Sequence, residues 1–167
     1  MNKTCVMTIS SIGIIGVGNP LRKDDGIGIF LLDYIKKESN TLSETISFVD
    51  GGTGGMNLLH IFNRFDVVII LDAVNFQGKP GETRFFTFDD ISSQKQVSTV
   101  STHNADLFQI IRIGQELDEC PKKIFVFGVQ PFDVSFGEGL TKPVQDQLTD
   151  IIGSMKHHVF KLIKEQK

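Results

Sequence analysis

Short apolar runs alternate with helical patterns along this chain, and this alternation limits the fold more than any other feature. The apolar runs predict strands at Ile12–Val17, Val67–Leu71 and Lys123–Val129. Apolar residues at helical spacing predict helices at Ile27–Lys37 and from about residue 104 to 117. Strands that are apolar throughout are typical of parallel sheets covered on both sides, so the sequence predicts an α/β fold.

Weaker patterns complete the predicted fold. They indicate strands at Thr45–Val49 and Thr83–Phe88, a short helix near Met56–Phe62 and a last helix at Pro143–Lys164. A hairpin-like turn precedes Thr83, so this strand is expected to pair antiparallel at an edge. We therefore predict a three-layer sandwich, with a mostly parallel twisted sheet of about five strands and helices on both faces. No linker or repeat interrupts residues 1–167, which are expected to form a single domain.

Composition narrows the class of protein. A net charge of -3 offers no broad basic surface, so nucleic acid is not an expected partner. No apolar run approaches the roughly 20 residues that span a bilayer, and the N-terminus lacks the pattern of a signal peptide. Cys5 and Cys120 lie far apart, outside any Cys-x-x-Cys pair, which fits a reducing compartment. We expect a soluble, cytoplasmic protein without membrane insertion.

The turn between the first strand and the first helix, Gly16–Gly28, carries two adjacent carboxylates, Asp24 and Asp25. Helix capping explains one acid, because aspartate at a helix N-terminus accepts backbone hydrogen bonds and interacts favourably with the macrodipole. We expect one of the pair to cap the helix and the other to point into a cleft as a catalytic or metal-binding group. These considerations do not distinguish Asp24 from Asp25.

Three other candidates are predicted at the same edge of the sheet. Asp50 and Asp72 end strands, and His103 begins a helix after a polar loop. Ligands of open α/β sheets bind outside the carboxyl ends of the strands. Asp72 has an alternative role as the cap of a following turn, and His103 has one as a surface or capping histidine. Two carboxylates and one imidazole nevertheless form a set suited to a divalent metal.

Two glycine-containing segments invite a phosphate-binding interpretation. The dinucleotide fingerprint is incomplete, because Leu21 occupies the place of its third glycine, and the acid pair would repel a pyrophosphate. The run Gly51–Gly55 lacks the Lys-Ser/Thr ending of a P-loop. Its glycines allow positive φ angles and the close approach of an extended peptide, while a mobile loop is the alternative.

The remaining histidines and the search for nucleophile motifs give no further candidates for the site. No Gly-x-Ser-x-Gly elbow, His-Glu-x-x-His helix or cysteine beside a histidine points to a serine, cysteine or preformed zinc hydrolase. His60 lies in an apolar stretch and is expected to pack in the core. His157 and His158 are expected to form a solvated surface pair.

Several motifs, in this order and spacing, resemble those of the nickel–iron hydrogenase maturation endopeptidases, and the resemblance covers nearly the whole chain. The motifs are Gly16-Val17-Gly18-Asn19 with Asp24-Asp25-Gly26-x-Gly28, Asp50-Gly51-Gly52-Thr53, Asp72-Ala73, Ser101-Thr102-His103-Asn104, and Gly128-Val129-Gln130-Pro131 with Gly139-Leu140-Thr141. Members of this family remove a C-terminal extension from the hydrogenase large-subunit precursor.

The resemblance implies a role for each candidate. It assigns metal binding and catalysis to Asp25, Asp72 and His103, and leaves Asp24 as a neighbouring or capping residue. It also implies that the nickel is supplied by the precursor, so no permanent metal is assumed. The scissile bond is expected beside a substrate-binding loop made of Asp50, Gly51, Gly52, Thr53 and Gly54.

The sequence allows more than one mechanism and more than one class of function. The ion could polarise the scissile carbonyl, activate water, or only position the substrate while a carboxylate acts as base. Instead of an enzyme, the chain could be a noncatalytic protein that checks nickel loading or escorts the precursor. A nucleotide-binding domain is the third interpretation.

Overall fold

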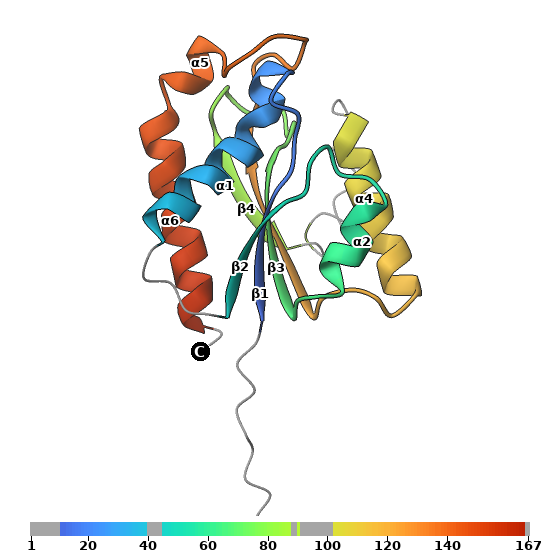
Figure 1. The fold of residues 1–167 in the computed structure, drawn as a ribbon. Coiled ribbons are helices and arrows are strands. Elements are labelled where there is room, and N and C mark those ends of the chain that lie inside the picture. Colours follow the sequence, from blue (N-terminus) through green and yellow to red (C-terminus); the bar gives the residue numbers. More distant parts are fainter. Residues whose placement is uncertain (1–10, 40–44, 88–89, 91–101, 166–167) are drawn as a thin grey trace, which may run out of the picture.

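The described residues form a five-stranded sheet with helices on both faces (Figure 1). The structure, a computed structural model, describes residues 11–39, 45–87, 90 and 102–165, without the side chains of 102–106 and 108. The strand order is β2-β1-β3-β5-β4. The strands are β1 (Ile12–Gly16), β2 (Ile46–Asp50), β3 (Val67–Ala73), β4 (Thr83–Thr87) and β5 (Lys123–Val129). Only β4, at the edge, runs antiparallel to its neighbour, as predicted.

The parallel register brings the ends of the central strands to one level. Gly16, the last residue of β1, pairs with Asp50 on one side and with Leu71 on the other. Asp72 follows Leu71 and pairs with Gly128 of β5. The carboxyl ends of β1, β2 and β3 therefore meet at the same edge of the sheet, where the candidate residues were expected.

Two apolar layers enclose the sheet. Side chains such as Ile14 and Ile69 face the layer of α1 (Ile27–Glu38) and α6 (Leu148–Glu165). Their neighbours Ile15 and Ile70 face the layer of α2 (Asn57–Phe62) and α4 (Thr102–Glu116). Each fully buried aliphatic side chain contributes roughly 1.5–3 kcal/mol of transfer free energy, so burial on both faces stabilises the central strands. Figure 1 shows the two helical layers on opposite sides of the sheet.

The predicted last helix, Pro143–Lys164, is wrong as one continuous element. The structure has a short helix α5 (Lys142–Gln145), a turn, and then α6. At the turn the backbone N–H of Gln147 donates to the Val144 carbonyl, 3.1 Å away. This contact spans three residues rather than four and tightens the backbone between the two helices.

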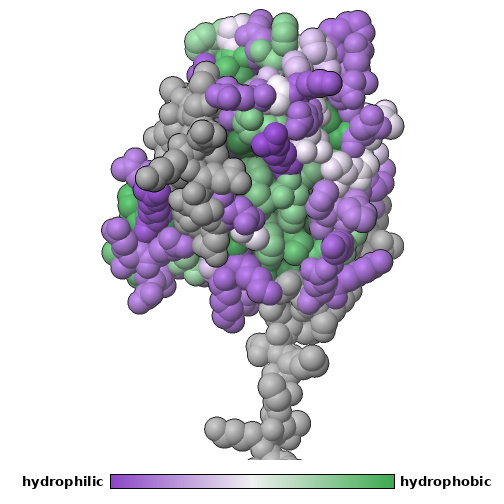
Figure 2. All heavy atoms as spheres, turned by 180° about the vertical axis from the view of Figure 1, so that it is seen from behind, coloured by the Kyte–Doolittle hydropathy of each residue, from purple (hydrophilic) through white to green (hydrophobic). Residues whose placement is uncertain are grey.

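Seen from behind, the molecule has apolar residues gathered at the centre of the face, with polar residues around them (Figure 2).

Two further findings concern helices and cysteines. Across the described residues, no helix combines the length and the apolar character needed to cross a membrane. Cys120 is a free, half-buried thiol, while Cys5 and the N-terminal segment up to residue 10 lie outside the described residues.

Candidate active site

The connection from β1 to α1 passes through a 3-10 helix, η1 (Lys23–Gly26), that packs tightly against the sheet. Glycines make this packing possible. A Cβ on Gly28 would lie 2.2 Å from the carbonyl oxygens of both Leu71 and Val17. Gly18 has φ 139°, and a Cβ there would lie 1.9 Å from the Asp25 carbonyl oxygen. The close approach carries the acid pair of η1 to the end of β3.

Asp25 is buried in this turn, with 2% of its surface exposed. Its Oδ2 accepts a hydrogen bond from the Asn19 backbone N–H at 3.0 Å, and its own N–H donates to the Arg22 carbonyl at 3.0 Å. The turn thus fixes both the backbone and the carboxylate of Asp25.

Asp72 is a second buried carboxylate at the same edge, 1% exposed. Its Oδ2 has no hydrogen-bond partner among the described residues. Burial raises the pKa of Asp72 well above its ordinary value, and the negative charge of Asp25 raises it further; a hydrogen bond from the Ala73 N–H opposes these effects. A buried carboxylate oxygen without a donor, next to a second carboxylate, is a place where a cation or a proton is stabilised.

His103, the third predicted ligand, lies in the first turn of α4. Since α4 precedes the parallel strand β5, this first turn is at the edge where the strands end, and Figure 1 shows α4 beginning there. The side chain of His103 lies outside the described residues. Within the described part of the chain, no three His, Cys, Asp or Glu side chains form a metal site. The three-residue ligand set therefore stays a prediction.

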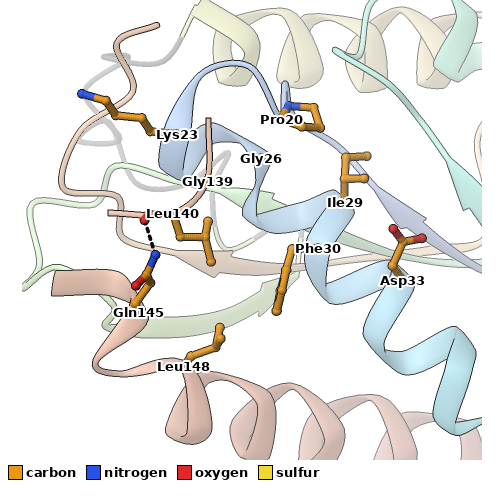
Figure 3. Close-up of a pocket in the computed structure, with 10 residues that line it drawn as sticks. All are labelled: Pro20, Lys23, Gly26, Ile29, Phe30, Asp33, Gly139, Leu140, Gln145 and Leu148. Atoms are coloured by element: carbon orange, nitrogen blue, oxygen red, sulfur yellow. Dashed lines mark hydrogen bonds between the residues drawn. The ribbon is translucent and has the colours of Figure 1, made fainter. Parts of the chain in front are cut away.

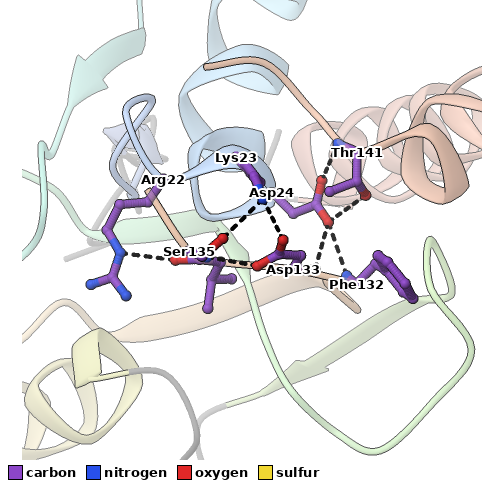
Figure 4. A network of polar contacts seen from close by, with 8 residues as sticks. Arg22, Lys23, Asp24, Phe132, Asp133, Ser135 and Thr141 are labelled. Atoms are coloured by element: carbon purple, nitrogen blue, oxygen red, sulfur yellow. Dashed lines mark hydrogen bonds and ion pairs between the residues drawn. The ribbon is translucent and has the colours of Figure 1, made fainter. Parts of the chain in front are cut away.

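Of the two roles expected for Asp24, a neighbouring or a capping residue, capping is wrong. Its side chain makes no capping hydrogen bond to η1 or α1. Instead the fully buried carboxylate accepts four hydrogen bonds from the segment after β5 (Figure 4). The donors are the backbone N–H groups of Phe132, Asp133 and Thr141, at 2.9, 3.1 and 2.7 Å, and the Thr141 hydroxyl, at 2.7 Å. The expected cap is therefore a tether between η1 and a segment more than a hundred residues away.

Neighbouring residues reinforce this tether. The Lys23 ammonium contacts the Asp133 carboxylate at 2.5 Å and the Ser135 hydroxyl at 2.9 Å. The pKa of Asp133 is lowered to about 2, chiefly by the hydrogen bond from Lys23. The Arg22 side chain donates to the Val134 carbonyl at 3.0 Å. Sequence reasoning missed this network, because its partners are distant in the chain and no local pattern links them.

The predicted substrate loop, Asp50–Gly54, lies beside the first turn. The Asp50 carboxylate accepts a hydrogen bond from the Gly52 N–H at 2.7 Å, and the Gly52 carbonyl accepts one from Gly18 at 2.8 Å. Gly52 and Gly54 have φ angles of 55° and 83°, so the expected positive φ angles are confirmed. A Cβ on Gly52 would meet nothing within 4 Å, which leaves its backbone accessible.

Gln130 is a further organising residue that the sequence did not single out, although it belongs to a quoted motif. Its buried side-chain oxygen accepts hydrogen bonds from the backbone N–H groups of Phe76 and Gly78, at 2.9 and 3.1 Å. Its amide nitrogen donates to the Asn75 side chain at 3.2 Å. Gln130 thereby fixes the connection that leaves β3 just after Asp72.

A cavity of about 640 Å³ lies on another side of η1 (Figure 3). None of the predicted site residues lines it. Its walls are Pro20, Lys23, Gly26, Ile29, Phe30, Asp33, Gly139, Leu140, Gln145 and Leu148. The carboxylate pair and this cavity are therefore separate features of the same end of the molecule.

Two expectations about histidines are wrong. His60 is exposed instead of packed, because it lies on the outer side of α2. Of the predicted solvated pair, only His157 is exposed. The His158 ring is half-buried and stacks on Phe85, with ring centroids 4.7 Å apart.

The chain is similar to proteins of hydrogenase maturation. The model of the family described as hydrogenase maturation protease (HycI) matches residues 33–157. The hydrogenase expression/formation protein HupD of Bradyrhizobium diazoefficiens is 28% identical over 140 residues, which are 83% of this chain and 72% of HupD. The chain spans 65% of HupD from Rhizobium leguminosarum. The hydrogenase 2 maturation protease of Escherichia coli is 29% identical over 132 residues, 79% of this chain and 80% of that protein.

Solved structures share the fold. The hydrogenase maturating endopeptidase HybD from E. coli superposes with a TM-score of 0.74 and 26% identity, over 90% of this chain and 92% of HybD. The solution structure of an endopeptidase from Escherichia coli gives a TM-score of 0.75 and 27% identity, over 86% of this chain and 88% of that one.

Proposed function

Since the chain belongs to the hydrogenase maturation protease family, we propose that it is an endopeptidase that removes the C-terminal extension of a nickel–iron hydrogenase large-subunit precursor after nickel insertion. The nickel is part of the substrate. The enzyme contributes Asp25, Asp72 and His103, which contact the nickel-bearing end of the precursor.

The observation that carries this proposal is the buried carboxylate pair. Asp72 has an oxygen without a hydrogen-bond donor among the described residues, and the charge of Asp25 acts on it. Two carboxylates held close in a buried place repel one another, and a divalent cation removes that repulsion. Carboxylate and imidazole ligands suit such an ion and leave coordination positions for the precursor's own groups or for water.

The chain's own residues orient the substrate around this pair. The Asn19 N–H holds the Asp25 carboxylate, and the tight contact of Gly28 with β3 sets η1 beside Asp72. The substrate's nickel, when bound here, would polarise the scissile carbonyl or activate a water molecule. A carboxylate that is not occupied by the ion can accept the proton of that water.

The glycine-rich loop Asp50–Gly54 supports the binding of an extended chain. The Gly52 N–H and carbonyl already bond to Asp50 and Gly18, while the open space around Gly52 lets a peptide approach without interference from a side chain. Because Gly52 is hydrogen-bonded to Gly18, a peptide on this loop lies next to the turn that holds Asp25.

We propose that the protein acts in the cytoplasm and that it binds neither nucleic acid nor a membrane.

The test is cleavage of the precursor in two forms. Purified protein is mixed with nickel-loaded and with nickel-free large-subunit precursor encoded in the same genome, and mass spectrometry follows release of the C-terminal peptide. We expect cleavage of the nickel-loaded form only. Equal cleavage of both forms would refute the role of nickel. Binding of the nickel-loaded form without release of a peptide would favour the escort function.

A further inference from the structure

Large apolar side chains are exposed mainly at the end of the molecule that carries the carboxylate pair. Five of the six in the described part of the chain follow the carboxyl end of a strand: Leu21, Phe30, Met56, Phe132 and Phe136. The sixth, Leu117, follows α4 and precedes β5, at the opposite edge. Single exposed apolar side chains are normal on a protein surface, so their concentration at this one end is the feature that calls for an explanation.

Two of these side chains lie on one segment, the β5–α5 loop (residues 130–141), that the structure holds firmly. Asp24 accepts four hydrogen bonds from it. The Lys23 N–H donates to the Gly137 carbonyl at 2.9 Å, and the Gly137 N–H donates to the Leu21 carbonyl at 3.0 Å. Arg22 forms an isolated parallel bridge with Gly137. Figure 4 shows the polar contacts between this loop and η1.

The loop nevertheless directs its aromatic side chains into solvent. Phe132 is 63% exposed and Phe136 is 82% exposed. The Arg22 guanidinium lies 5.7 Å from the centre of the Phe136 ring. Rigid aromatic side chains lose little conformational entropy when a partner covers them, and phenylalanine is among the residues enriched in protein–protein interfaces. The polar contacts of Asp24 and Lys23 therefore fix the loop, while its two aromatic rings stay exposed for contact with a partner.

The position of the loop identifies the partner. Asp24, which binds the Phe132 N–H at 2.9 Å, is the residue directly before Asp25. A protein that presents its chain end to Asp25 and Asp72 would cover about 800 Å² around them, as one side of a standard interface. A patch of that size, about 30 Å across, extends over the neighbouring loop.

We infer that Phe132 and Phe136 form a docking surface for the large-subunit precursor itself, outside the segment that is cleaved. This inference rests on the proposed function. The occupant is an apolar patch on the folded part of the precursor, next to its C-terminal extension. Asp24 holds the backbone at Phe132, and the contacts of Lys23 and Leu21 with Gly137 hold the backbone next to Phe136.

The experiment replaces both rings and compares them with a matched residue elsewhere. The double variant F132A/F136A and the control L117A, which loses an exposed apolar side chain at the opposite edge, are assayed with nickel-loaded precursor from the same genome. We expect the double variant to raise KM by about tenfold or more with kcat unchanged. L117A should stay within about twofold of wild type in both constants. Both variants should unfold at the wild-type denaturant concentration.

Separate measurements distinguish failure of docking from failure of the proposed function. Isothermal titration with nickel-free precursor, which the proposed function says is not cleaved, measures binding alone, and the double variant should lose about tenfold in affinity there as well. If wild type cleaves the precursor and the double variant has the same KM, docking through these rings is refuted and the proposed function stands. If sedimentation shows that the double variant has lost self-association, the rings bind a second copy and the inference is wrong. Wild type that neither binds nor cleaves the precursor overturns both.

Discussion

Asp24→Asn tests a buried carboxylate that accepts four hydrogen bonds from a distant segment. The carboxylate accepts three hydrogen bonds on Oδ2 and one on Oδ1. An asparagine can direct its oxygen toward the three donors, but its NH₂ group then faces the Thr141 N–H, which loses its acceptor. The three remaining bonds also weaken, because hydrogen bonds to a charged group contribute about 1.5–3 kcal/mol and neutral ones about 1 kcal/mol.

The expected loss is about 2–4 kcal/mol in the free energy of unfolding, after allowance for the lower desolvation cost of the neutral side chain. For a domain of this size 1 kcal/mol corresponds to about 2–4 °C, so Tm should fall by roughly 4–16 °C. Urea denaturation measures the free energy, and calorimetry measures Tm. Asp133→Asn, the same substitution on the exposed side of the network, is the control and should have a much smaller effect. An Asp24→Asn protein within about 0.5 kcal/mol of wild type would refute the tether.

Three other substitutions and one control, Gly153→Ala, test neighbouring parts of the structure and the site. Asp72→Asn should stabilise the protein at neutral pH. Because the pKa of Asp72 is raised in the folded protein, the native state binds more protons than the unfolded chain. The free energy of unfolding of the wild type therefore falls as pH rises above the ordinary aspartate pKa. Urea titrations should show the variant's advantage growing with pH and vanishing in acid. Gly28→Ala, whose Cβ would meet two carbonyl oxygens, should lower the free energy of unfolding by at least about 3 kcal/mol. Gly153→Ala, which has open space on α6, should raise it by about 0.5–1 kcal/mol in the same assay. His103→Ala should abolish precursor processing in a cleavage assay. If the variant processed the precursor at the wild-type rate, His103 would not belong to the site.

The sequence predicted the fold well where burial patterns are continuous. β5 has the predicted bounds, Lys123–Val129, because apolar residues run through it without a break. The antiparallel edge at β4 followed from the turn residues before it. The last helix was predicted as one, since Val144, Leu148 and Ile151 keep helical spacing across the break. Apolar spacing records which face is buried, whereas the break is a change of backbone hydrogen bonding at Gln147.

The site was predictable only in part. The positions of Asp25 and Asp72 followed from strand ends in a parallel sheet, and the structure brings both to that edge. The role of Asp24 could not be predicted from its surroundings in sequence, because its four donors come from Phe132, Asp133 and Thr141. The adjacent acid pair predicted two different roles for its members, but only the folded chain shows that Asp24 binds a distant segment.

The most direct test of the account is the cleavage rate of the Asp72→Asn protein with nickel-loaded precursor. Stability and activity should move in opposite directions in this variant. The carboxylate whose Oδ2 has no hydrogen-bond partner among the described residues costs stability, and in the proposed function it contacts the substrate's nickel. We predict at least a 100-fold lower single-turnover rate, of about the size that a positioned acid–base group contributes, in a protein that resists urea better than wild type at neutral pH. Cleavage at the wild-type rate would contradict the assignment of the carboxylate pair as the active site.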